Sequence, residues 1–184
     1  MELIKLTREV EAVQIPYGQK IGLPGGSEVS IHQVLGGNYT VQTEDGLLVR
    51  IDGRDADALG FEPSKGEPAP APSEDATLDL DRVVKAVWDH LRTCYDPEIP
   101  VNIVELGLVY ECRVAPEPSG GFGVDVKMTL TAPGCGMGPI LQSDAEQKIQ
   151  TIPGVKRVTI ELVLDPPWDP GRMSEAARLE LGMM

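Results

Sequence analysis

Thiols, imidazoles and aromatic rings are scarce in this chain of 184 residues, and their scarcity narrows the chemistry available to it. The sequence holds 3 cysteines and 2 histidines, and aromatic side chains make up 4% of it. Three cysteines at unrelated spacings do not form a disulfide framework, and they include no Cys-x-x-Cys pair of the kind that typically binds zinc. Each of Cys94, Cys112 and Cys135 therefore has to be judged singly.

Positive charge and long apolar runs are also lacking. The net charge is −13, and no cluster of Lys and Arg suited to displacing counterions from phosphates stands out. No stretch approaches the roughly 18 apolar residues of a membrane span. The N-terminus "MELIKLTREVEAVQIP" has neither the charged lead nor the apolar stretch of a signal peptide. We therefore expect no nucleic-acid partner, no membrane partner and a cytoplasmic location.

Proline, alanine and acidic residues concentrate in one segment, "FEPSKGEPAPAPSEDATLD" at residues 61–79. Because it has almost nothing to bury, the segment cannot offset the entropy lost on ordering, and we interpret it as a flexible spacer. The sequence thus predicts a small β-rich domain at residues 1–60, a linker at 61–77 and a second domain with a C-terminal tail at 78–184.

Residues 1–60 alternate short apolar segments with glycine-containing turns, a pattern typical of a small all-β unit. The expected strands lie within residues 3–15, 26–35, 38–44 and 47–53. Four or five such strands would most economically curl into a partly open barrel, which removes exposed edges. His32 lies among alternating residues, so we interpret it as a surface or core side chain rather than a ligand.

At the start of the second domain, the spacing of apolar residues is helical rather than that of a strand. The expected elements are a helix at 78–94, a strand at 106–114, a strand at 124–131, a helix at 138–150 and a strand at 155–164. The first helix has Asp79 or Asp81 as its N-cap, and its apolar stripe is Val84, Val87, Trp88, Leu91 and Tyr95. The order predicts an α+β fold, an α-β-β-α-β domain with both helices on one face of a short sheet, preceded by the small all-β domain.

Cys135 stands in "TLTAPGCGMGPIL", residues 129–141, between a predicted strand and a predicted helix. The free amides and the dipole at a helix N-terminus stabilise a thiolate, and Gly134 and Gly136 keep bulky groups away from the sulfur. This pattern predicts an accessible, reactive thiol, although the cysteine can also simply fill space in a glycine turn. By contrast, the positions of Cys94 and Cys112 suit small buried hydrophobes.

A second unusual stretch, "YDPEIPVNIVELGLVY" at residues 95–110, carries Asp96, Glu98 and Glu105. Carboxylates beside prolines ordinarily form turns. They can also orient a reactive or metal-bound thiol, or present charge to a partner. Because both helices are expected on the same sheet face, this acidic-proline loop could approach the Cys135 segment.

The motifs "DPEIPVNIVELGLVY", "VKMTLTAPGCGMG" and "IPGVKRVTIELVLDPPWDPGRMSEAARLELG" occur in this order. Residues 80–182 thereby resemble the domain family shared by SufT, the PaaD maturation protein and eukaryotic cytosolic iron–sulfur targeting factors, and the whole chain is most similar to the SufT type. The resemblance implies a helper in building or delivering iron–sulfur clusters. It assigns Cys135 to the cluster or metal, and it places Asp96 and Glu98 in the acidic-proline motif of the site.

Two departures from the family pattern stand out. Many relatives have Asp where this chain has Glu105, and many have Pro where it has Gly136, which leaves the loop more mobile. An iron–sulfur cluster normally takes four thiolates, whereas this domain offers one plausible donor. We therefore expect a transient cluster, shared with a second copy, a small thiol, the assembly machinery or an apo client protein.

The leading hypothesis is a non-enzymatic accessory factor for iron–sulfur cluster assembly or delivery. One alternative makes Cys135 an enzymatic nucleophile, which needs a base nearby, and the only histidines are His32 and His90. A second alternative is a pure protein–protein adaptor with an incidental thiol. In the tail, Trp168 and Arg172 either pack on the core or form a partner-binding surface.

Overall fold

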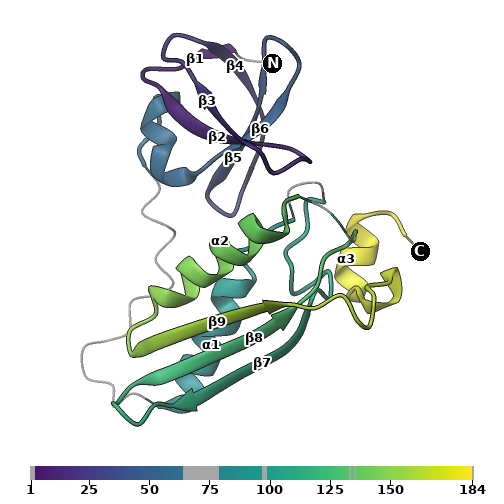
Figure 1. Ribbon diagram of the computed structural model, residues 1–184. Coiled ribbons are helices and arrows are strands. Elements are labelled where there is room, and N and C mark those ends of the chain that lie inside the picture. Colours follow the sequence, from purple (N-terminus) through teal and green to yellow (C-terminus); the bar gives the residue numbers. More distant parts are fainter. Residues whose placement is uncertain (1–2, 64–78, 97–98, 133, 135, 184) are drawn as a thin grey trace. The chain divides into compact units, whose positions relative to one another are not determined.

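The computed structural model describes residues 3–63, 79–96, 99–132, 134 and 136–183. The chain divides into two compact units, residues 1–68 and 69–184 (Figure 1). Most of the expected linker, together with Glu98 and Cys135 of the expected site, lies outside the described residues.

The first unit is a single curled sheet (Figure 1). Its strands are β1 (Leu3–Lys5), β2 (Val10–Gln14), β3 (Lys20–Leu23), β4 (Glu28–Leu35), β5 (Asn38–Thr43) and β6 (Leu48–Ile51). All pairings are antiparallel, in the order β1-β4-β5-β6-β2-β3. A 3₁₀ helix, η1 (Gly53–Leu59), follows β6 and buries Leu59 in the same core as Val41 and Val49.

The count of four or five strands was wrong, because the described part of this unit has six. The segment 3–15 does not form one strand, since the chain leaves the sheet after β1 to contact η1. There Thr7 N–H donates to Ala58 O at 2.8 Å, and the Arg8 guanidinium pairs with Asp55 and Asp57 at 2.8 and 2.7 Å. The short β3, which the sequence pattern did not predict, buries only Leu23.

The second unit has the predicted α-β-β-α-β order followed by a structured tail. Its elements are α1 (Leu80–Leu91), β7 (Val109–Pro116), β8 (Phe122–Met128), α2 (Gly138–Gln150), β9 (Val155–Leu162), η2 (Pro170–Arg172) and α3 (Glu175–Glu180). β7 pairs antiparallel with β8, and β8 pairs parallel with β9 after the crossover through α2. The α+β fold class is confirmed.

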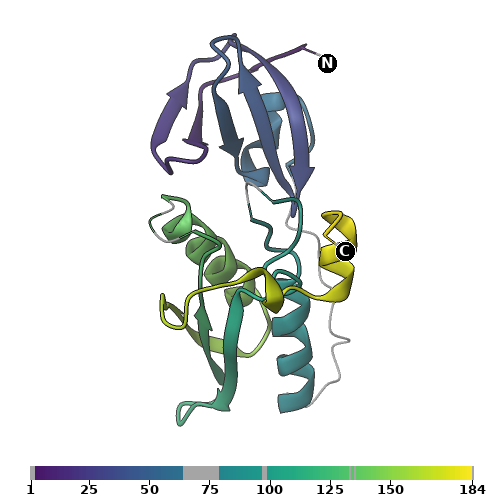
Figure 2. The ribbon, with the colours of Figure 1, turned by 90° about the vertical axis from the view of Figure 1, so that its right-hand side faces the viewer.

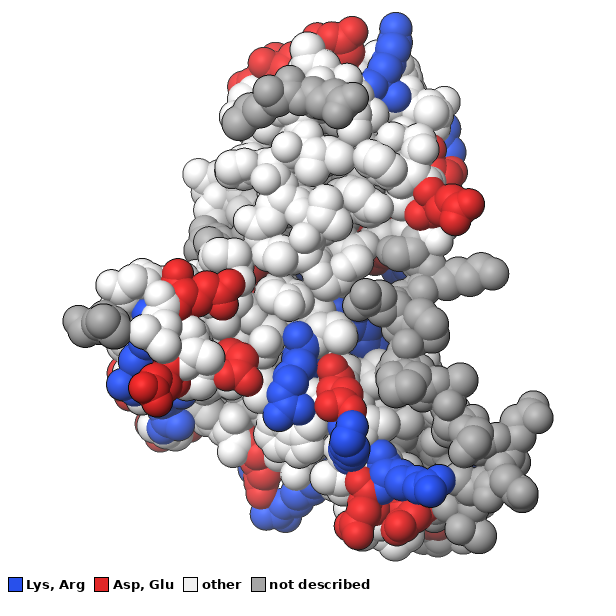
Figure 3. All heavy atoms as spheres, turned by 180° about the vertical axis from the view of Figure 1, so that it is seen from behind, with Lys and Arg blue, Asp and Glu red and all other residues white. Residues whose placement is uncertain are grey.

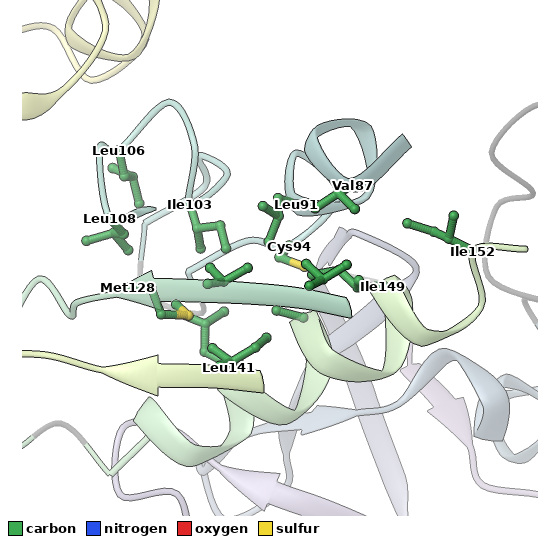
Figure 4. Packing of buried hydrophobic residues seen from close by; sticks show 14 of the residues in the cluster. Val87, Leu91, Cys94, Ile103, Leu106, Leu108, Met128, Leu141, Ile149 and Ile152 are labelled. Carbon is green, nitrogen blue, oxygen red and sulfur yellow. The ribbon is translucent and has the colours of Figure 1, made fainter. Parts of the chain in front are cut away.

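The two faces of the three-stranded sheet differ sharply in polarity. Val124, Val126 and Met128 of β8 are buried on one face, whereas Asp125 and Lys127 alternate with them on the other. Both helices cover the apolar face, as predicted. Figure 4 shows side chains from α1, α2, β8 and the loop before β7 converging in this core.

The apolar stripe of α1 is rotated slightly from the predicted one. Val83, Val87 and Leu91 are its buried residues, and Val84 is only half-buried. The stripe continues into Cys94, which is fully buried, so Val87 and Leu91 of the predicted stripe are confirmed, whereas Val83 and Cys94 take the places expected for Val84 and Tyr95. Asp79 is the N-cap, accepting a hydrogen bond from Asp81 N at 3.4 Å.

Both edges of the second sheet carry features that limit further strand pairing. Val163 N–H donates to Met128 O, so the neighbouring even-numbered residues of β9 direct their backbone groups away from β8. On that free edge, Gln142 of α2 donates to Ile160 O at 2.6 Å. The opposite edge strand ends in Pro116, which has no N–H to donate.

Candidate functional site

The Cys135 segment connects the end of β8 to the start of α2. Thr129 is buried, and its N–H donates to Leu108 O at 2.8 Å, which fixes the chain where it leaves the strand. The chain then runs through Thr131 toward α2. Pro133 and Cys135 lie outside the described residues, so the expected thiolate stays a prediction.

The N-terminus of α2 has no protein group that competes for an anion among its described residues. Met137 is the N-cap and makes no side-chain cap hydrogen bond, and the first turn contains no acidic residue. The first amides of a helix lack intrahelical partners and favour negative charge. Gly138 lies close to the end of β8, because an added Cβ would be 2.8 Å from Leu130 Cδ1. The helix therefore begins packed on the end of β8 with its amides uncapped by side chains.

Asp96 joins the acidic-proline loop to the strand end that leads to Cys135. It is only 6% exposed, and its Oδ1 accepts from Ile99 N at 3.2 Å. Its Oδ2 accepts from Thr131 Oγ1 at 3.4 Å. Asp96 thus forms a turn in its own loop. It also contacts Thr131, which precedes Cys135 by four residues in the sequence. Glu98 lies outside the described residues.

The remainder of the loop continues this connection to the core. Asn102 Oδ1 accepts from the backbone N–H groups of Val104 and Glu105 at 3.1 and 3.0 Å and begins a tight turn. Ile103 N–H donates to Cys94 O at 2.9 Å, which ties the loop to the end of α1. Leu108 beside Met128 closes the loop onto β8 (Figure 4).

The two other thiols are unsuited to thiolate chemistry at neutral pH. Cys94 is fully buried, with its Sγ 3.6 Å from His90 O. Burial raises the pKa of the Cys112 thiol to about 11. Because the thiolate is the metal ligand and nucleophile, neither side chain matches Cys135 as a candidate.

The two histidines provide little support for nucleophilic catalysis. His90 is a residue of α1, and its Nδ1 lies 2.7 Å from Ala86 O of the same helix. His32 is exposed on β4 in the first unit. Among the described residues, no group of three or more His, Cys, Asp and Glu side chains is arranged to hold a metal ion.

The tail packs on the acidic-proline loop, which the sequence alone did not reveal. Trp168 Nε1 donates to Leu106 O at 2.8 Å, and the Arg172 guanidinium lies 4.3 Å from the Tyr110 ring centre. Tyr110 in turn donates from its hydroxyl to Pro166 O at 2.8 Å. Figure 2 shows the yellow C-terminal segment crossing the teal chain near β7. Packing is therefore the role that the structure shows for Trp168 and Arg172.

The polar face of the sheet contains a hollow of about 250 Å³ that does not include the predicted site residues. Its lining is Glu111, Arg113, Asp125, Val126, Lys127, Thr159 and Glu161. Charges of opposite sign neutralise one another there, as in the Arg113–Glu111 pair at 2.6 Å. The face drawn in Figure 3 also shows blue and red side chains interspersed rather than gathered into one basic area.

The described helices are too short or too polar to cross a bilayer. A family model for iron–sulfur cluster assembly proteins matches residues 84–162, which span the domain that contains the candidate site. This match, together with the α-β-β-α-β order and the convergence of the two motifs, places the second unit in the class of iron–sulfur cluster assembly domains.

Comparison with individual proteins narrows the class. The chain is 48% identical over 94 residues to an Fe-S protein maturation auxiliary factor of Porphyromonas gingivalis, a match that covers 51% of this chain and 86% of the relative. It is 40% identical over 88 residues to the maturation auxiliary factor SufT of Staphylococcus aureus, covering 48% of this chain and 96% of the relative. The chain therefore belongs to the SufT-type family of iron–sulfur protein maturation factors.

A similar segment also occurs inside a longer protein. The chain is 30% identical over 82 residues to the iron–sulfur cluster carrier protein of Synechocystis. That match covers 45% of this chain but 22% of the relative. The family domain thus forms a minor part of a carrier in one protein and follows a small β-rich unit in the present one.

Proposed function

We propose that this protein is a non-enzymatic accessory factor that handles an iron–sulfur cluster transiently through Cys135 and passes it to apo client proteins in the cytoplasm. The observation that carries the proposal is the convergence of the acidic-proline loop on the Cys135 segment, through the Asp96–Thr131 hydrogen bond. Membership in a family of maturation factors supports the same role.

The proposal assigns different tasks to the residues of the site. Cys135 supplies the thiolate that binds iron, and the start of α2, without a side-chain cap, favours the charged form of a nearby sulfur. Asp96 holds its loop against the strand end that precedes the cysteine. Glu98 follows in the same motif and adds a carboxylate to the site.

Incomplete ligation suits a protein that must release its cargo. A cluster normally takes four thiolates. Cys94 is fully buried and the pKa of Cys112 is raised, so neither is suited to join Cys135. The other ligands would come from a second copy, a small thiol or a partner protein. Exchange of these outside ligands is the step that transfers the cluster.

The expected partners are the assembly machinery and apo client proteins. In the relative from Synechocystis, a similar segment forms part of an iron–sulfur cluster carrier protein. This supports the proposal that the present protein works together with a cluster carrier. An enzymatic role finds less support, because His90 is engaged with its own helix. A pure adaptor remains the alternative that the experiment has to separate.

The test is anaerobic loading of the full chain with ferrous iron and sulfide under reducing conditions. Iron, sulfide and visible absorption are measured for the wild type, for Cys135→Ser and for Cys112→Ser as the matched control. We expect the wild type and the control to bind substoichiometric cluster that a chelator removes quickly, and Cys135→Ser to bind none while keeping its circular dichroism spectrum. Full binding by Cys135→Ser would refute the residue assignment, and absence of binding by the wild type would favour the adaptor.

A further inference from the structure

The C-terminal segment contacts three consecutive residues of the acidic-proline loop. Ser174 N–H donates to Glu105 O at 2.9 Å, and Trp168 Nε1 donates to Leu106 O at 2.8 Å. At Gly107, where φ is +69°, an added Cβ would collide with the Arg172 backbone carbonyl. The tail therefore fits this part of the loop closely enough that the third of these residues, Gly107, has to be glycine.

The same segment is firmly anchored to the second unit. Met173 and Ala177 are 6% and 2% exposed and belong to its hydrophobic core. Ser174 caps α3 by accepting from Ala177 N at 3.1 Å, and Arg178 donates to Gly171 O at 2.6 Å. A segment held in this way can restrain the loop on which it rests.

The loop transmits this restraint to the strand end that leads to Cys135. Leu108, one residue after Gly107, donates to Ile103 O and accepts from Thr129 N, with distances of 3.0 and 2.8 Å. Thr131 lies two residues beyond Thr129 and donates to Asp96. An unbroken chain of hydrogen bonds and covalent links therefore runs from Trp168 to Asp96.

We propose that residues 166–181 form a C-terminal clamp that positions the acidic-proline loop and the Cys135 segment against each other, with Trp168 as the positioning residue. The segment lies beyond residues 84–162, which the family model matches. The use of this geometry for cluster handling rests on the proposed function, whereas the positioning itself does not.

The experiment uses the full chain with Trp168→Phe, which keeps an apolar ring and removes the indole N–H. Leu179→Ala is the matched control, because Leu179 belongs to α3 of the same segment and is 55% exposed. Amide hydrogen exchange is measured at Leu108 and Thr129. The pH profile of Cys135 alkylation by iodoacetamide is followed by mass spectrometry of the peptides.

We expect Trp168→Phe to speed exchange at both amides by about fivefold, the factor that corresponds to one lost hydrogen bond. We also expect it to shift the midpoint of the alkylation profile, and Leu179→Ala to leave both readouts unchanged. Arg172→Gln, which removes the cation over Tyr110, should act in the same direction and serves if Trp168→Phe does not fold.

Unchanged exchange at Leu108 and Thr129 in the folded variants would overturn the clamp. Faster exchange with an unchanged alkylation profile would overturn its positioning role and leave it only a stabilising one. Neither readout requires a bound cluster. If Cys135→Ser retained cluster binding while Trp168→Phe changed both readouts, the proposed function would fail and the clamp would stand.

Discussion

Thr131 donates a hydrogen bond to Asp96 across a sequence separation of 35 residues, with 3.4 Å between Oγ1 and Oδ2. The carboxylate is only 6% exposed, and this hydroxyl is one of the groups that donate to it. The contact joins the acidic-proline motif to the cysteine motif. Its consequences for stability are directly measurable.

Replacing Thr131 with Val keeps the shape of the side chain and removes its hydroxyl. We expect the free energy of unfolding to fall by about 1 kcal/mol, because the buried Asp96 carboxylate loses a donor. Thr151→Val is the control, since its hydroxyl donates to Lys148 O on an exposed helix end, and it should change stability by less than about 0.5 kcal/mol. Urea titration measures both, and equal effects would contradict the importance of the Asp96 contact.

Gly107→Ala tests the fit between the loop and the tail. The substitution combines a positive φ with a collision against the Arg172 carbonyl, so we expect a loss of more than about 2 kcal/mol. Gly120→Ala is the control, because Gly120 has φ +87° but nothing within 4 Å of an added Cβ. It should show the backbone cost alone, about 1 kcal/mol. Thermal or urea unfolding compares them, and equal losses would mean that the tail does not confine Gly107.

The Cys112 thiol should be inert at neutral pH. Burial raises its pKa to about 11, so the protonated, weakly nucleophilic form predominates near pH 7. We expect its alkylation to remain slow at pH 7 and to accelerate up to about pH 11, whereas denaturant should bring it close to the rate of an ordinary thiol. Peptide mass spectrometry after timed iodoacetamide treatment measures the rate. Rapid modification of the native protein at pH 7 would contradict the expectation.

Asp125 and Arg157 link stability to pH on the polar face of the sheet. The hydrogen-bonded Arg157 guanidinium, 2.6 Å away, holds the pKa of Asp125 below its usual value. A lowered carboxyl pKa adds stability at neutral pH, and this contribution is lost as the pH falls through the native pKa. Arg157→Gln should therefore destabilise the protein only slightly at pH 7, because the pair is exposed, and should have almost no effect near pH 2. Urea midpoints at the two pH values provide the comparison.

The main elements of the second unit follow from local patterns. Periodicity and turn residues predict α1, β7, β8, α2 and β9. The side chains of Asp79 and Ser174 can accept from backbone N–H groups, and they are the N-caps of α1 and α3. Whether Val83 or Val84 is buried depends on the rotation of α1 about its axis against the sheet. The sequence of the helix alone does not determine this rotation. In the first unit, the break between β1 and β2 results from contacts of Arg8 with Asp55 and Asp57, which are distant in sequence.

In the candidate site, too, some features follow from the local sequence and others depend on tertiary packing. The sequence and the family resemblance single out Asp96, Glu98 and Cys135, but they do not measure their separation. The turn role of Asp96 is a local property, since its carboxylate accepts from Ile99 N. The Thr131 contact and the Trp168 contact with Leu106 depend on tertiary packing, so only the three-dimensional structure reveals them.

The side chain of Gln142, which occupies a main-chain acceptor on the outer strand, has a consequence for how the molecule associates. With Pro116 at the opposite border, lateral growth of the sheet by recruitment of a foreign strand is discouraged on both flanks. The proposed function therefore predicts that a client protein contacts side chains or loops of this unit rather than extending its three-stranded sheet.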